Sequence, residues 1–172
     1  MGAHVPGPHY PTYDPRTPNS LETWPFKTLL ERFVDPSTMT LQEAGFEDAL
    51  ERYRSKLAAQ APTQPIALKH PMTAAVLPQI SRAFDARLIF VMRPLDAIEA
   101  TRVRRNWEVG SASSASLIYD RIGRFMDQTA TPYELVDYED LTADPAAVAR
   151  RLAEFTGLTY CDEAPKVVRT AS

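Results

Sequence analysis

The stretch that decides the fold is residues 88–101, Leu-Ile-Phe-Val-Met-Arg-Pro-Leu-Asp-Ala-Ile-Glu-Ala-Thr. Its first half, with Arg87 before it, is apolar without alternation, and this pattern predicts a strand over 87–92. Such a run is typical of a strand in a parallel sheet that is covered on both faces. A helix over about 95–107 is predicted to follow at once. A strand that leads directly into a helix indicates an α/β fold with a parallel sheet.

The rest of the chain continues this alternation of strands and helices. Apart from the central pair, the predicted elements are strands at 66–69 and 133–138 and helices at about 21–34, 73–84, 115–129 and 145–157. A further helix is predicted to begin at a capping box formed by Thr40 and Glu43 and to end before Pro62. Asp144 is predicted to cap the last helix, with Pro145 at its first position and Gly157 at its end.

The first residues of the chain are rich in proline. Of the fifteen prolines, seven lie before residue 37. Because proline fixes φ and removes a backbone donor, we expect residues 1–19 to form an irregular, extended arm. Asn19 or Ser20 is then the predicted cap of the first helix, with Pro25 in its first turn. The predicted organisation is an arm at 1–20, one α/β domain at 21–158 and a tail at 159–172.

Composition excludes several classes of protein. The net charge of −3 argues against a general nucleic-acid binder, which carries a basic surplus. No apolar run approaches the roughly 20 residues of a membrane span, and the N-terminus lacks the apolar core of a secretory signal. We therefore expect a soluble, cytoplasmic protein. A single cysteine, Cys161, excludes an internal disulfide, and together with three scattered histidines it makes a metal site improbable.

Three segments in order carry a resemblance to a known family. They are Leu-Lys-His-Pro at 68–71, the stretch 88–101, and Leu-Val-Asp-Tyr-Glu-Asp-Leu-Thr-Ala-Asp-Pro at 135–145, which Gly157 and Leu158 follow after a helix. This succession resembles the sulfotransferases that use 3′-phosphoadenosine-5′-phosphosulfate, especially the bacterial type. The resemblance implies a three-layer parallel sheet with flanking helices, of the kind found in P-loop proteins. It also implies transfer of a sulfuryl group to a hydroxyl or amine of a small-molecule or carbohydrate acceptor.

Arg93 and Thr101 are the candidate donor-binding residues. Arg93 follows a predicted parallel strand, at the sheet edge where α/β proteins bind ligands, and its planar guanidinium suits a phosphate. The resemblance implies that Arg93 and Thr101 hold the 3′-phosphate of the donor. The alternative is an arginine paired with Asp96 or Glu99. The cluster Arg102, Arg104 and Arg105 either extends the positive field or forms a solvated helix face.

Lys69 and His70 are the candidate catalytic residues. Sulfuryl transfer requires that charge on the moving group be neutralised and that a base take the proton of the acceptor. A lysine supplies a point charge, and a histidine with a pKa of about 6.5 supplies a base at neutral pH. A structural histidine is the alternative, because cytosolic members of the family space the two residues differently. Trp24 and Trp107 either stack on an acceptor or pack structurally, and we interpret Tyr138, Glu139 and Asp140 as structural residues.

The glycine-rich loop that binds the 5′-phosphosulfate in this family has no match here. None of the six glycines belongs to such a motif. Residues 1–8, Met-Gly-Ala-His-Val-Pro-Gly-Pro, resemble the turn that follows the loop and its helix in bacterial members, so we expect an N-terminally truncated domain that is weak or inactive alone. The alternative is a vestigial nucleotide-binding or structural module without turnover. Three visible strands are few, so either further strands are missing or the chain depends on a partner, with a second copy as one alternative.

Overall fold

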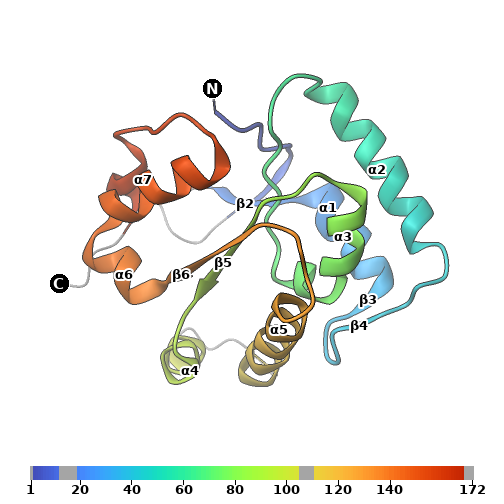
Figure 1. Cartoon of the computed structure of the whole chain (residues 1–172). Coiled ribbons are helices and arrows are strands. Elements are labelled where there is room, and N and C mark those ends of the chain that lie inside the picture. The colour runs from blue at the N-terminus through green and yellow to red at the C-terminus, as the bar shows by residue number, and fades with distance from the viewer. Residues whose placement is uncertain (1, 12–18, 105–110, 169–172) are drawn as a thin grey trace.

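A computed structural model describes residues 2–11, 19–104 and 111–168 (Figure 1). The strands are β1 (His9–Pro11), β2 (Asn19–Thr23), β3 (Val34–Asp35), β4 (Thr40–Leu41), β5 (Leu88–Met92) and β6 (Tyr133–Asp137). The α-helices are α1 (Trp24–Phe33), α2 (Phe46–Gln60), α3 (Leu77–Ala83), α4 (Leu95–Arg104), α5 (Ser111–Met126), α6 (Tyr138–Ala143) and α7 (Pro145–Thr156). Two 3₁₀ helices, η1 (Pro71–Val76) and η2 (Ala164–Val167), complete the described chain.

The centre of the molecule is the parallel pair of β5 and β6, which confirms both predicted strands and the α/β class. The register runs from Leu88 opposite Tyr133 to Met92 opposite Asp137. Because the strands are parallel, α4 and α6 leave from the same end of the pair, as Figure 1 shows. Within the described residues each sheet has two strands, so the wider three-layer sheet stays a prediction.

Coverage of the central strands differs from the expectation. Phe90 is buried and belongs to the same core cluster as Ile122 of α5. Val136 of β6 is fully buried, and α7 packs against this strand. Ile89 and Val91 of β5, however, are 39% and 50% exposed. The prediction that this strand is covered on both faces was therefore wrong. Side chains alternate along a strand, and the described helices cover only one side of β5.

The main core lies among α1, α2, α3, η1 and α5. Its fully buried members recur at helical spacing, and Phe26 and Leu30 of α1 meet Phe46 and Leu50 of α2 in one cluster. Burial of each large apolar side chain stabilises the fold by roughly 1.5–3 kcal/mol relative to exposure. Phe90 belongs to the same cluster, which therefore fixes the helices against which β5 packs.

The first helix begins later than predicted. Thr23, not Asn19 or Ser20, caps α1, because its hydroxyl accepts a hydrogen bond from the amide of Phe26 at 3.4 Å. Asn19 and Ser20 instead lie in β2, which pairs antiparallel with β1. Part of the predicted irregular arm is thus a strand, and Pro25 lies in the first turn of α1 as predicted.

The second helix also begins later, and its predicted capping box was wrong. Thr40 belongs to β4 and pairs with Asp35 of β3 in a two-stranded hairpin. The helix α2 starts at Phe46, after Gly45, whose φ of 80° lies in the left-handed region that glycine adopts readily.

The predicted strand at 66–69 forms only an isolated parallel bridge between Ile66 and His4. Its hydrogen bonds run from the His4 amide to the Pro65 carbonyl at 2.7 Å and from the Ala67 amide to the His4 carbonyl at 2.9 Å. The helix predicted over 73–84 divides into η1 and α3, with Pro78 in the first turn of α3.

The last helix, α7, is confirmed at both ends. The Asp144 carboxylate accepts a hydrogen bond from the amide of Ala147 at 3.0 Å, and Pro145 is the first helical residue. Gly157 ends the helix with a φ of 72°. None of the described helices is long and apolar enough to cross a membrane.

Candidate functional site

Arg93 and Tyr138 come together at the end of the central strand pair. Each directly follows the last residue of its strand, and those last residues, Met92 and Asp137, are opposite one another in the parallel register. The guanidinium carbon of Arg93 lies 4.9 Å from the centroid of the Tyr138 ring. This is the distance of a cation–π contact. Tyr138, interpreted from the sequence as structural, is therefore a candidate site residue that sequence reasoning missed.

Tyr119 of α5 holds the backbone of the same arginine. The amide of Arg93 donates to the Tyr119 hydroxyl at 2.8 Å, and that hydroxyl donates to the Arg93 carbonyl at 2.7 Å. Both distances are those of good hydrogen bonds. The hydroxyl thus satisfies both backbone groups of a residue that lies just beyond the strand ladder.

The positive charge of Arg93 meets no carboxylate among its described contacts. Asp96, one of the two alternative partners, accepts a hydrogen bond from the amide of Ala97 at 2.8 Å. The Nε atom of Arg93 is buried and makes no hydrogen bond within the described residues. A buried donor without an acceptor costs about 1–3 kcal/mol. The geometry therefore presents a cation whose hydrogen-bonding capacity is partly unused.

Thr101 lies on α4, which packs against α5. Its side chain is partly buried, and the hydroxyl donates to the carbonyl of Ala97 at 3.0 Å. The predicted role of Thr101 stays a prediction, since the hydroxyl would have to turn from this carbonyl to donate to a ligand. Arg104 is exposed, whereas the side chains of Arg102 and Arg105 and the whole of Trp107 lie outside the described residues.

Lys69 lies in a different setting from Arg93. Its ammonium is 3.3 Å from the carboxylate of Glu22, which belongs to β2. The side chain of Lys69 is 60% exposed, so this is a surface ion pair of small energetic value. Trp24, which follows on the same segment, is 43% exposed, and the Lys27 ammonium lies 5.6 Å from its ring centroid.

His70 caps η1. Its Nδ1 atom accepts a hydrogen bond from the amide of Met72 at 3.2 Å, which leaves the proton of the neutral ring on Nε2. Burial lowers the pKa of His70, and the positive charges of Lys27 and Lys69 act in the same direction, against the charges of Glu22 and Glu31. The ring is therefore neutral at pH 7, as a base must be. The lone pair of Nδ1, which a base would use, is however occupied by the hydrogen bond from the Met72 amide.

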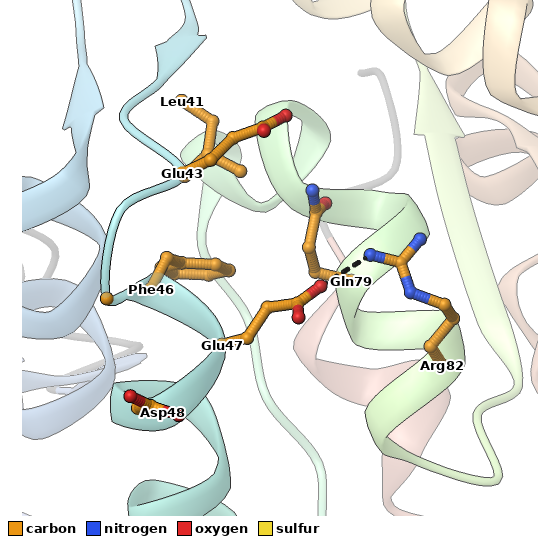
Figure 2. A pocket seen from close by; sticks show the side chains of 8 residues that line it. Leu41, Glu43, Phe46, Glu47, Asp48, Gln79 and Arg82 are labelled. Atoms are coloured by element: carbon orange, nitrogen blue, oxygen red, sulfur yellow. Dashed lines mark hydrogen bonds and ion pairs between the residues drawn. The ribbon is translucent and has the colours of Figure 1, made fainter.

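A cavity of about 350 Å³ lies between α2 and α3 (Figure 2), and none of the four predicted site residues lines it. It is lined by Leu41, Glu43, Gly45, Phe46, Glu47, Asp48, Gln79 and Arg82. The only cation of this lining, Arg82, is paired with Glu47 at 2.8 Å. The acidic surplus would repel an anionic nucleotide, so this cavity is not a suitable donor site.

Comparison with known proteins supports one family. The sequence profile of the Sulfotransferase family matches residues 10–162. The fold is similar to the Sulfotransferase Domain from the Curacin Biosynthetic Pathway, with a TM-score of 0.60, 17% identity, and coverage of 75% of this chain and 53% of that one. Esterase EstD of Thermotoga maritima is 25% identical in an alignment 137 residues long that covers 73% of this chain and 33% of the esterase. The chain thus spans about half of the solved domain and a third of the curated relative.

Proposed function

This chain belongs to the sulfotransferase family, and on that basis we propose that it binds 3′-phosphoadenosine-5′-phosphosulfate and serves in sulfuryl transfer to a hydroxyl or amine acceptor. The observation that carries the proposal is the guanidinium of Arg93, which lies over the Tyr138 ring at the end of β5 with no carboxylate among its described contacts. A cation held in this way is suited to an anionic group of a ligand.

Arg93 is proposed to bind the 3′-phosphate of the donor. A guanidinium offers two parallel N–H donors to two phosphate oxygens, which gives both energy and orientation. The Tyr138 ring supports one face of the guanidinium and carries no formal charge, so it does not compete with the phosphate. A carboxylate in the same place would have to be displaced, at a cost in affinity.

Thr101 is proposed to assist Arg93 from α4. Its hydroxyl donates to the carbonyl of Ala97, a residue of the same helix. Exchange of that bond for one to a phosphate oxygen replaces a neutral acceptor with a charged one, which is the stronger of the two.

Lys69 and His70 are proposed to act at the sulfuryl group. In the transfer, the acceptor oxygen or nitrogen attacks sulfur, the bond from sulfur to the phosphate oxygen breaks, and 3′,5′-adenosine bisphosphate leaves. Lys69 would leave its ion pair with Glu22 and pair with the leaving phosphate instead. His70 would take the proton of the acceptor. Because Nδ1 of His70 accepts the Met72 amide, this role requires that the ring release that bond.

Titration calorimetry of the full chain with 3′,5′-adenosine bisphosphate tests the binding step. We expect saturable binding that weakens at least tenfold in Arg93→Ala and less in Arg93→Lys, which keeps the charge but loses the planar fork. Arg54→Ala is the matched control, because Arg54 is an exposed arginine paired with Glu51 at 2.7 Å. Absence of saturable binding, or binding that is indifferent to Arg93, would overturn the proposal.

An assay with a sulfate-labelled donor and a panel of hydroxyl and amine acceptors tests transfer. Transfer that is lost in Lys69→Ala and His70→Gln supports the proposed roles. Binding of the donor without transfer to any acceptor would instead support a nucleotide-binding module without turnover. Ester hydrolysis, which the name of EstD suggests, is not favoured here, since no hydrogen bond joins a serine to a histidine within the described residues.

A further inference from the structure

We infer that Tyr119 is a positioning residue for Arg93, fixing the arginine from which the anion site is built. This inference rests on the proposed function, because its value lies in the phosphate that Arg93 is proposed to bind. The observation behind it is that one hydroxyl, from a different element, engages both backbone groups of Arg93.

The position of Arg93 explains why such a partner is needed. The ladder between β5 and β6 ends at Met92 and Asp137, so the next residue has no strand partner in the described register. Pro94 follows, and a residue before proline is confined to extended backbone. Extended backbone directs its N–H and C=O sideways, and both groups need partners if they are not solvated. The Tyr119 hydroxyl supplies both, acceptor to the amide at 2.8 Å and donor to the carbonyl at 2.7 Å.

Tyr119 is itself well held. It is partly buried on α5 and packs against the main core cluster, next to Leu117 and Ile118 in sequence. Its hydroxyl therefore has a fixed location relative to the core. The contact transmits that location to the Arg93 backbone, from which the side chain extends over Tyr138.

The two tyrosines hold Arg93 without neutralising its positive charge. Tyr119 binds the backbone, Tyr138 lies under the guanidinium, and both are neutral. An arginine oriented by a carboxylate would be equally fixed but largely neutralised. Two aromatic supports give order while the full positive charge stays available for a phosphate, which is the arrangement that preorganised binding requires.

The test compares wild type, Tyr119→Phe and the control Tyr160→Phe for binding of 3′,5′-adenosine bisphosphate and of 5′-adenosine monophosphate, which lacks the 3′-phosphate. Tyr160 is another partly buried tyrosine, whose ring contacts Arg150 instead. We expect Tyr119→Phe to lose about tenfold in affinity for the bisphosphate, the size of one or two hydrogen bonds, with little change for the monophosphate. Tyr160→Phe should match wild type for both.

Discrimination between the two nucleotides separates positioning from a structural role, because general loss of structure would weaken both ligands alike. If wild type binds the bisphosphate and Tyr119→Phe discriminates as well as wild type, this inference alone is overturned. If wild type binds neither nucleotide, the proposed function fails and this inference fails with it.

Hydrogen exchange of the Arg93 amide provides a second measurement that needs no stable variant. In wild type this amide should be protected, since it donates to Tyr119. In Tyr119→Phe it should exchange faster, while the Phe90 amide within the strand keeps its protection. An Arg93 amide that exchanges in wild type as rapidly as in an unstructured peptide would overturn the inference even if Tyr119→Phe does not fold.

Discussion

The rings of Phe26 and Tyr53 stack with their centroids 5.7 Å apart and an interplanar angle of 15°, and this contact joins α1 to α2. Both side chains are buried, Phe26 at 1% and Tyr53 at 9% exposure. The Tyr53 hydroxyl is also buried, yet it makes no hydrogen bond within the described residues. The ring and the hydroxyl of Tyr53 are thus expected to differ in their contribution to stability.

Phe26→Ala should destabilise the fold by about 3–5 kcal/mol, because it removes a fully buried aromatic ring and leaves a cavity. Tyr53→Phe should change stability by less than about 1 kcal/mol, because it removes an unpaired polar group and keeps the ring. Urea unfolding of both variants measures the difference. A larger loss in Tyr53→Phe would show that the hydroxyl has a partner in solution, for which the nearby buried Thr23 is the first candidate.

The two sides of β5 give a matched pair of substitutions within one strand. Phe90→Ala should cost about 3–5 kcal/mol, because Phe90 is 7% exposed and packs in the core. Val91→Thr should change stability by about 0.5 kcal/mol or less, because Val91 is 50% exposed and threonine keeps the β-branched shape. Thermal unfolding compares the two. A cost in Val91→Thr close to that of Phe90→Ala would mean that this side of the strand is covered in solution.

His70 should make the fold sensitive to mild acid. Burial is the main cause that lowers the pKa of His70 below its usual value of about 6.5, so the unfolded chain takes up this proton first as the pH falls. The contribution of neutral His70 is thus fully present above about pH 6.5 and is lost as the pH falls through the lower pKa of the folded state. The free energy of unfolding should decrease over this range.

The matched variant for this measurement is His70→Asn, because asparagine can still cap η1 through the Met72 amide. Urea unfolding at pH 7.5 and pH 5.5 should show a smaller loss of stability in the variant than in wild type. All other titrating groups are common to the two proteins, so the difference isolates His70. Equal losses in both proteins would contradict the prediction.

Asp144→Ala should destabilise the chain by about 1 kcal/mol, because the Asp144 carboxylate caps α7 through the Ala147 amide. Asp144→Asn should retain most of the stability, since asparagine is a comparable cap. Asp127→Ala removes an exposed carboxylate from outside any helix and serves as the control. Chemical denaturation ranks the stability of the three variants. A loss of stability in Asp127→Ala as large as that in Asp144→Ala would show that loss of the cap is not the cause.

The elements predicted correctly are those that local sequence determines. The runs at 88–92 and 133–137 form strands as predicted, although only one side of β5 is buried. Asp144, Pro145 and Gly157 mark the ends of α7 by their backbone preferences. In each case the signal lies within a few residues of the element itself.

The errors arise where a distant segment decides the local structure. Thr40 has the spacing of a helix cap, but pairing with Asp35 draws it into a hairpin. Asn19 is a good cap by composition, but it lies opposite Pro11 in β2. The residues around Ile66 are typical of a buried strand, yet Ile66 forms only a single described bridge, to His4.

The candidate site follows the same division. Arg93 could be named as a candidate from the sequence, because it follows an obvious strand and matches a family motif. Its contacts with Tyr119 and Tyr138 could not, because they depend on how α5 and β6 pack against β5. A tyrosine directly after the next strand is the one signal that could have identified Tyr138.

The parallel register between β5 and β6 has a consequence for biosynthesis. Arg93 and Tyr138 meet only when Met92 lies opposite Asp137, and a long stretch of chain, including α4 and α5, separates them in the sequence. Contacts between distant segments form slowly, because the entropy of closing the loop is lost before they are made. A ribosome must therefore release the chain well past residue 138 before the proposed anion site can form, and the proposed nucleotide binding should appear only after the helical signal of the nascent protein has developed.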